Sequence, residues 1–168
     1  MSRNKFITNI IIVGMLLSAC GYRFAGSGSF PAGIKKVFIV ILKNRTAETG
    51  IENTITNDLR YEFIRYNRVV TRDKADAILS GEVKSSRVET ISRRGVQTSQ
   101  ERRVTVSVDL QLTDSNGRVV WSVQGISANE AFDVVSDKQA AEQNRRAAIS
   151  ALSKRLAENV YYRLTENF

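Results

Sequence analysis

Histidine is absent from this sequence, and cysteine and proline are nearly so. Its 168 residues include no His, one Cys and one Pro. Without histidine there can be no Ser-His-Asp triad, no imidazole acid or base and no His-ligated metal. One cysteine forms neither an internal disulfide nor a cysteine-based zinc site. No phosphate-binding glycine loop is present either, so we expect a protein that is not an enzyme and needs no cofactor.

Acidic residues are also scarce. Asp and Glu together number 17 against 25 Lys and Arg, which gives a formal charge of +8. The 42% of hydrophobic and 25% of charged residues are typical of a globular protein of about one domain. The excess of positive charge favours an acidic partner, which could be nucleic acid, anionic lipid or the phosphates of lipopolysaccharide (LPS).

The N-terminal segment lacks a hydrophobic run long enough to cross a membrane. The mostly apolar residues Phe6 to Leu17 follow Arg3 and Lys5. As a helix this stretch would span about 18 Å, against a hydrocarbon core of about 30 Å. Residues 1–19 are therefore predicted to be a signal peptide that is removed, which lowers the charge to +6 because Arg3 and Lys5 are lost.

The end of this segment, Leu17-Ser18-Ala19-Cys20, resembles the lipobox of bacterial lipoprotein precursors. The resemblance implies cleavage after Ala19, a diacylglycerol on the Cys20 thiol and acylation of the new N-terminus. Such an anchor holds a protein on a membrane without spanning it. Gly21 follows Cys20 where many inner-membrane lipoproteins carry Asp, which implies the periplasmic side of the outer membrane. An exported protein meets little nucleic acid, so we exclude that partner.

The rest of the chain is predicted to be a tether over 20–34 and one α+β domain over 35–168. Four glycines and the single proline lie in the predicted tether. The continuous apolar run Val37–Leu42 predicts a strand buried on both faces near the centre of the sheet. Residues 50–66 predict an amphipathic helix, because apolar residues recur every fourth position. A long helix is expected from about 137 to 166, where neither Gly nor Pro occurs.

Three successive strands are expected between the helices. Residues 77–92 alternate imperfectly, which predicts a bulge or bend, and 104–112 alternate cleanly. A turn at 114–117 leads to a returning strand from Val119, and 69–71 is a candidate for a short extra strand. The predicted order is β-α-β-β-β-α. It indicates a two-layer sandwich, with a mixed four-stranded sheet and two helices on one face.

Basic residues concentrate around one predicted hairpin. Between Glu82 and Arg103 there are six basic and three acidic residues. Arg93-Arg94 and Arg102-Arg103 flank a predicted loop at 95–99, and a hairpin would bring them to one tip, with Arg102 and Arg103 on opposite faces. Guanidinium groups there could bind phosphates while apolar neighbours meet acyl chains. Alternatively, the charge keeps a long strand edge from pairing.

Several segments together resemble the LptE family of LPS-assembly lipoproteins. They are residues 20–24 (CGYRF), 31–39 (PAGIKKVFI), 44–46 (NRT) and 50–52 (GIE). The chain departs from the family pattern at Phe30, where Leu is expected, and has no proline in its first strand. The resemblance implies a two-layer sandwich that pairs with LptD, a large outer-membrane β-barrel. Such lipoproteins sit in the barrel lumen as a plug, help the barrel assemble and contact LPS on its way to the outer leaflet.

These interpretations assign lipidation to Cys20 and LPS-phosphate contact to Arg93, Arg94, Arg102 and Arg103. The expected partners are LptD, LPS and, through the lipid anchor, the outer membrane. The alternative is another outer-membrane lipoprotein that serves as a scaffold in a secretion or cell-wall complex. That alternative predicts normal surface LPS after depletion of the protein.

Overall fold

The computed structural model describes residues 30–93 and 100–166, so Cys20, Arg94 and the predicted signal peptide lie outside the described residues. The elements run in the order η1 (Pro31–Gly33), β1 (Val37–Ile39), β2 (Lys43–Asn44), α2 (Ile51–Arg65), η2 (Arg72–Lys74), β3 (Ala77–Arg93), β4 (Gln100–Asp114), β5 (Val119–Val134) and α3 (Lys138–Glu166). Within this part of the chain, no helix is both long and apolar enough to span a bilayer.

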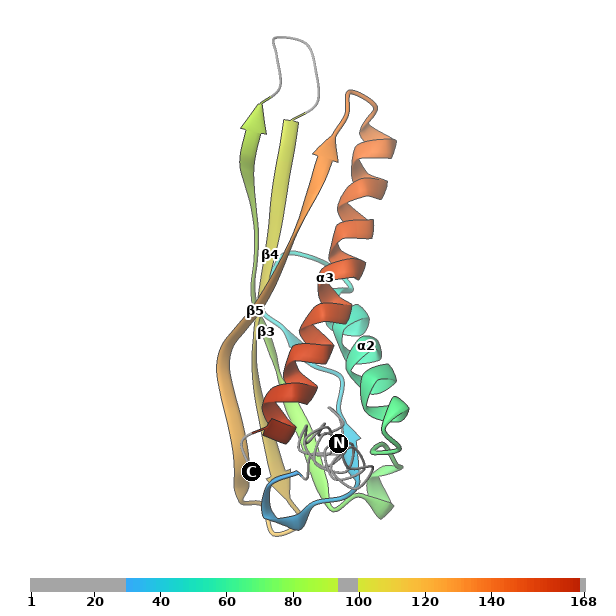
Figure 1. Cartoon of the computed structure of the whole chain (residues 1–168), viewed down its shortest axis with the longest axis vertical. Coiled ribbons are helices and arrows are strands. Elements are labelled where there is room, and N and C mark those ends of the chain that lie inside the picture. Colours follow the sequence, from blue (N-terminus) through green and yellow to red (C-terminus); the bar gives the residue numbers. More distant parts are fainter. Residues whose placement is uncertain (1–29, 94–99, 167–168) are drawn as a thin grey trace, which may run out of the picture.

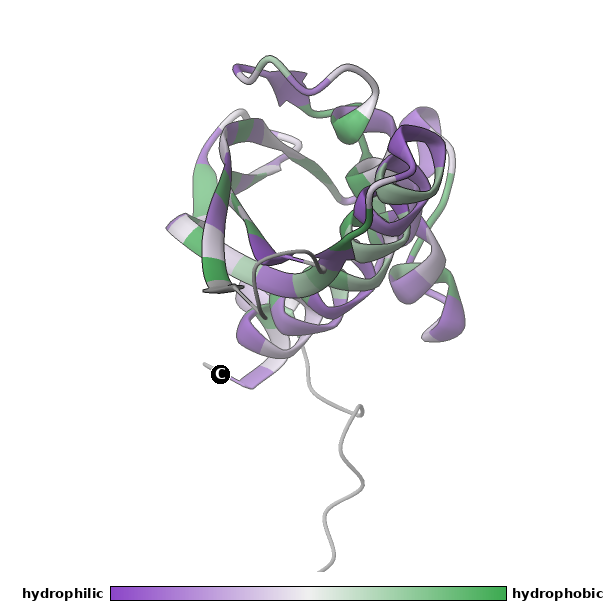
Figure 2. Cartoon of the chain, turned by 90° about the horizontal axis from the view of Figure 1, so that it is seen from above, coloured by the Kyte–Doolittle hydropathy of each residue, from purple (hydrophilic) through white to green (hydrophobic). Residues whose placement is uncertain are grey.

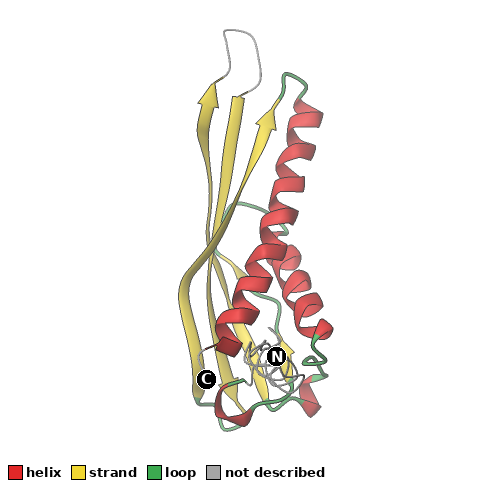
Figure 3. Cartoon of the chain, in the orientation of Figure 1, coloured by secondary structure: helices red, strands yellow, loops and turns green. Residues whose placement is uncertain are grey.

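The architecture is a mixed sheet with two helices on one face, which confirms the predicted α+β class (Figures 1 and 3). The strand order is β1-β3-β4-β5, and β2 also pairs with β3. β1 and β2 run parallel to β3, whereas β3, β4 and β5 form an antiparallel meander. The sheet has five strands rather than four, because the strand predicted at Val37–Leu42 ends at Ile39 and a separate short strand, β2, follows it at Lys43–Asn44. The extra strand expected at 69–71 is reduced to a single bridge between Val69 and Val37.

The prediction that the Val37–Leu42 strand lies near the sheet centre is wrong, because β1 is an edge strand. Val37 and Ile39 are buried, but Ile41 is 53% exposed. The strand breaks after Ile39, and the amide of Leu42 donates to the Thr56 hydroxyl on α2 at 3.1 Å instead of continuing the ladder. The continuous apolar run therefore begins with an edge strand, and only one side of the run is fully buried.

The core lies between the sheet and the helices. The predicted stripe on α2 is buried in full at Ile51, Ile55, Leu59 and Phe63. On β4, residues 104, 106, 108, 110 and 112 are all buried and the residues between them are not, as the alternation predicted. Viewed from above, hydrophobic and hydrophilic residues are interspersed along the ribbons, as expected for elements with one buried side (Figure 2).

The two helices cover the sheet unequally. α3 follows β5 along much of the long axis, while the shorter α2 packs beside the lower part of α3 (Figure 1). At the lower end, Phe30 and Tyr161 meet edge to face, with ring centroids 5.9 Å apart. Phe30 and Ile34 are buried in this core, although both fall within the predicted tether. Within the described residues the packed chain thus begins at Phe30, and the domain boundary at 34/35 stays a prediction.

Candidate functional site

The β3–β4 hairpin extends along the long axis away from η1 and η2 (Figure 1). Its register runs from Ala77 opposite Asp114 to Arg93 opposite Gln100. At about 3.3 Å per residue, the 15 residues of β4 span about 50 Å. The predicted bend in β3 is present as register shifts at Val83/Ser85 and Thr90/Ser92. The hairpin therefore carries its basic residues far from the point where the packed chain begins.

Only part of the predicted arginine quartet can be placed. The backbone of Arg93 pairs with Gln100, two residues from Arg102. Arg94 lies outside the described residues, as does the side chain of Arg93. The pairing nonetheless brings the backbone of Arg93 and that of Arg102 to neighbouring positions at the same end of the sheet.

Arg102 and Arg103 point to opposite faces, as strand alternation requires. Arg102 lies between Thr90 and Phe132 on the helix-facing side, where its guanidinium donates to Gln100 Oε1 at 3.0 and 3.3 Å. Arg103 is exposed on the other side, directly across from Glu89. A ligand that contacts both guanidinium groups must therefore meet the end of the hairpin rather than one of its faces.

Arg87 is a further cation of this surface that the sequence argument did not select. It pairs with Thr105 and so lies diagonally across from Arg103 on the same exposed face. Among the residues that the structure describes, neither arginine has a carboxylate within ion-pair distance. Val88, 42% exposed, pairs with Val104 and so lies on the helix-facing side with Arg102, while Ile91, 39% exposed, lies at the register shift of β3. We call Arg87, Arg93, Arg94, Arg102 and Arg103 the hairpin cluster.

Lys84, from the same basic segment, is already engaged. Its Nζ donates to Asp109 Oδ2 at 2.8 Å, and Asp109 Oδ1 accepts the amide of Gly125 at 2.6 Å. Both bonds, the one from Lys84 foremost, hold the pKa of the Asp109 carboxyl below its usual value. Gly125 has a φ of 65°, a conformation that glycine tolerates best. Lys84 therefore pairs with the carboxylate that bonds the Gly125 backbone of β5, and its charge is compensated within the fold.

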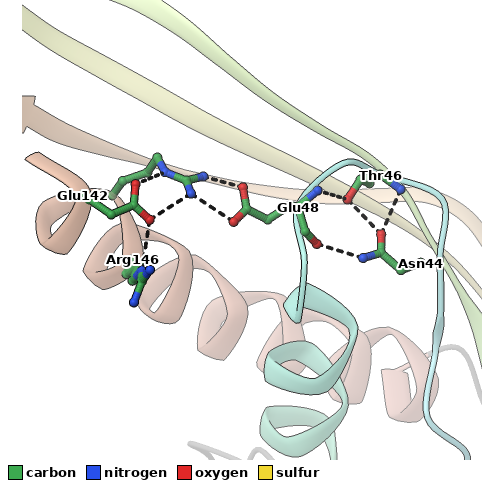
Figure 4. A network of polar contacts seen from close by, with 6 residues as sticks. Asn44, Thr46, Glu48, Glu142 and Arg146 are labelled. Atoms are coloured by element: carbon green, nitrogen blue, oxygen red, sulfur yellow. Dashed lines mark hydrogen bonds and ion pairs between the residues drawn. The ribbon is translucent and has the colours of Figure 1, made fainter. Parts of the chain in front are cut away.

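A second polar network ties the loop before α2 to α3 (Figure 4). Arg145 donates to both carboxylate oxygens of Glu48 and, at 2.9 and 3.1 Å, to Glu142, which also accepts from Arg146 at 3.0 Å. These arginines lower the pKa of Glu142 to about 2. Glu48 and Arg145 are 97 residues apart, so no local sequence signal could have revealed the pair. A groove of about 830 Å³ adjoins this network, but Arg145 is occupied by its two carboxylates.

Metal binding finds no support in the described part of the chain, where no cluster of three or more acidic or thiol side chains could hold an ion.

Comparison with known proteins places this fold in a family. The family model described as lipopolysaccharide-assembly, LptE, matches residues 34–164. The chain belongs to the LptE family. Membership supports an LPS-assembly lipoprotein associated with the outer membrane, in a family that is not enzymatic. Among curated proteins, none matches the chain.

Solved lipoprotein structures share the fold of this LptE-family chain at low sequence identity. Uncharacterized lipoprotein B from Nitrosomonas europaea has a TM-score of 0.54 and 17% identity, covering 86% of this chain and 90% of its own. A putative lipoprotein from Caulobacter crescentus has a TM-score of 0.53 and 16% identity over 74% and 88% of the two chains. A minor lipoprotein from Acinetobacter baumannii has a TM-score of 0.51 and 16% identity over 79% and 92%. At these identities the likeness concerns the fold alone.

Proposed function

We propose that this chain is the lipoprotein subunit of the LPS translocon. It occupies the lumen of the LptD β-barrel, helps that barrel assemble and contacts LPS during its insertion into the outer leaflet. The observation that carries this proposal is the family match over residues 34–164. The lumen of a large outer-membrane barrel is polar, which suits a basic domain with many exposed charges.

The membrane attachment in this proposal comes from the lipobox. Removal of residues 1–19 and acylation of Cys20 would place the domain at the periplasmic side of the outer membrane, within reach of the barrel. Mass spectrometry of the mature protein tests this step. We expect a Cys20 N-terminus that carries acyl chains, palmitate among them, and loss of the modification in a Cys20→Ser chain.

The LPS contact is assigned to the hairpin cluster. Guanidinium groups bind phosphate oxygens through two parallel hydrogen bonds, and the exposed arginines at this end have donors to spare. The neighbouring exposed side chains of Val88 and Ile91 offer apolar contact for acyl chains. Arg93, Arg94, Arg102 and Arg103 remain the proposed phosphate ligands, and the structure adds Arg87 as a fifth candidate.

Depletion of the protein, followed by labelling of surface LPS and isolation of the barrel, tests the function. We expect surface LPS to fall and correctly assembled LptD to decrease, because the barrel would lack its plug. Normal LPS in depleted cells, with the barrel unaffected, would instead support the scaffold alternative.

A further inference from the structure

Two regions of the fold account for the whole net charge of the mature chain. The segment 82–103 contributes +3, as its composition already indicates. Residues 35–36 and 62–76 together hold six basic and three acidic residues, which is also +3. The rest of residues 20–168 has eleven basic and eleven acidic residues and is neutral. The second basic group has no role in the proposed function so far.

This second group surrounds the point where the packed chain begins. Asp76 joins its two segments, because Asp76 Oδ2 accepts the amides of Lys35 and Lys36 at 3.0 and 2.8 Å. Lys36 Nζ bonds the backbone oxygen and the side chain of Asn67, at the end of α2. In Figure 1 these segments, with η1 and η2, lie at the opposite end of the long axis from the hairpin cluster.

Three cations of this end are exposed and uncommitted to carboxylates. Lys35, Arg72 and Lys74 are exposed, and no ion pair joins them to a carboxylate in the described chain. The Arg72 guanidinium lies 5.4 Å from the centre of the Phe38 ring, which holds it at the surface. The Asp76 carboxylate accepts the two backbone amides and, in the described chain, forms no ion pair with the Lys35 ammonium. We call Lys35, Arg72 and Lys74 the basal patch.

An exposed apolar side chain lies at this end of the fold, on the last turn of α2. Ile64 is 59% exposed. The amide of Asn67 donates to the Ile64 carbonyl at 2.8 Å, which places Ile64 beside the Lys36–Asn67 contact. An aliphatic group close to lysine and arginine side chains is compatible with a lipid–water interface, where long basic side chains reach the headgroups.

We infer that the basal patch docks the domain onto an anionic phospholipid surface. The position of the chain outside the described structure identifies this occupant. Cys20 and Phe30 are ten residues apart, so an anchor at Cys20 keeps the basal end within about 35 Å of the bilayer. Phosphate headgroups complement the three free cations, and each basic side chain near such a surface strengthens attraction.

Docking at this end orients the molecule. The proposed anchor has three acyl chains, which suffice to attach the protein to the membrane. The basal patch therefore sets the orientation of the domain on the membrane. Contact at the basal end with the periplasmic leaflet, which holds the proposed anchor, leaves the hairpin cluster at the far end of the domain, about 50 Å along the hairpin strands, to meet LPS inside the barrel. The inference uses the proposed anchor at Cys20, while the patch itself is a property of the described domain.

Vesicle partitioning tests the inference with a chain that has no acyl groups. The mature chain from residue 20 with Cys20→Ser retains every described residue, including the whole core. Its binding is measured by co-flotation with vesicles of phosphatidylcholine alone and of phosphatidylcholine with phosphatidylglycerol. We expect binding only to the anionic vesicles, and a decrease with added salt because screening shortens the reach of charge to about 10 Å at 0.1 M.

Two variants of equal charge locate the contact. The change Lys35→Gln, Arg72→Gln and Lys74→Gln should weaken partitioning on the order of a hundred-fold. The matched control Lys43→Gln, Lys138→Gln and Lys154→Gln removes the same charge at exposed positions outside both basic groups and should change partitioning by less than about threefold. Circular dichroism and urea midpoints confirm that both variants fold. Equal losses in the two variants, or absence of binding by the parent chain, would overturn the inference.

LPS binding by the same proteins separates this inference from the proposed function. Loss of LPS binding in a hairpin variant, Arg87→Gln with Arg102→Gln and Arg103→Gln, together with loss of vesicle binding in the basal variant but not in its control, supports both. Absence of LPS binding in every chain counts against the proposed LPS contact and leaves the vesicle result to decide the docking. A basal variant that keeps vesicle binding but no longer copurifies with the barrel would assign the patch to the barrel and overturn membrane docking.

Discussion

The two ends of this molecule carry equal net charge on very different supports. At the basal end, cations extend from backbone that is fixed by Asp76 and Asn67 and rests on a core of Phe30, Phe63 and Tyr161. At the hairpin end, arginines extend from two strands with exposed apolar neighbours. The difference suggests a division of labour: the packed end sets position, and the extended end meets a mobile ligand.

The largest effect should come from breaking the packed end. Phe63 is fully buried and touches the rings of Phe30 and Tyr161, at centroid distances of 5.8 and 5.2 Å. Phe63→Ala should lower the free energy of unfolding by about 3–5 kcal/mol, since it removes a large side chain and leaves a cavity. Val88→Ala, at a half-exposed hairpin position, should cost less than about 1 kcal/mol. Urea denaturation measures both, and similar losses would contradict the contrast in packing.

The next largest effect should be on the binding of LPS by the hairpin cluster. Arg87→Gln, Arg102→Gln and Arg103→Gln together should weaken binding to purified LPS by about tenfold or more, because charge-assisted bonds to phosphate are lost. The basal variant Lys35→Gln, Arg72→Gln and Lys74→Gln has the same charge and serves as control. Equal LPS affinity in the two folded variants would remove the hairpin cluster from the site.

A smaller effect should come from the polar network that joins the loop before α2 to α3. Arg145→Gln should destabilise the fold by about 1 kcal/mol at pH 7, since Glu48 and Glu142 lose their shared partner. The folded-state pKa of Glu142 is about 2, below its usual value of 4.5. Its contribution is therefore present above pH 4.5 and lost as the pH falls toward 2.

The difference in urea midpoint between the parent and Arg145→Gln should accordingly shrink between pH 5 and pH 2. Arg60→Gln is a suitable control, because this arginine donates to the Ile39 carbonyl at 2.9 Å and pairs with no carboxylate in the described chain. A difference that stays constant with pH would show that Glu142 does not carry the interaction.

The smallest effect is expected at Lys84. Because its ammonium is bound to Asp109, Lys84→Gln should leave LPS affinity within about twofold of the parent, although it lies in the basic segment. Isothermal titration with LPS measures this, beside the hairpin variant as the sensitive case. A loss as large as in that variant would return Lys84 to the binding surface.

Patterns within single elements predicted the fold well. Apolar residues at every fourth position predicted the buried face of α2. Alternation of apolar and polar residues predicted the buried side of β4 and the opposite orientations of Arg102 and Arg103. The position of β1 was missed because an apolar run does not reveal whether further strands pair on both sides of it. Nor does it reveal what covers its second face, which at Phe38 is an arginine, Arg72. Whether an apolar strand lies at the edge of a sheet depends on its pairing with strands that are distant in the sequence.

The arrangement of the basic residues could be predicted only in part, and their role as a binding site stays a prediction. Clustered charge and the hairpin signal placed the arginines at one end of the sheet. The sequence could not show that Lys84 is bound by Asp109 or that Arg87 and Arg103 are diagonal neighbours, because both depend on strand register. The basal patch was missed for the same reason, since Asp76 brings together two segments about 40 residues apart.

Photo-crosslinking in living cells tests the central claim most directly. A photoreactive residue replaces Arg103 in the hairpin cluster, and the products are identified after outer-membrane isolation. The account predicts adducts with LPS and with the LptD barrel. Adducts confined to other proteins, from a folded and membrane-bound chain, would contradict it.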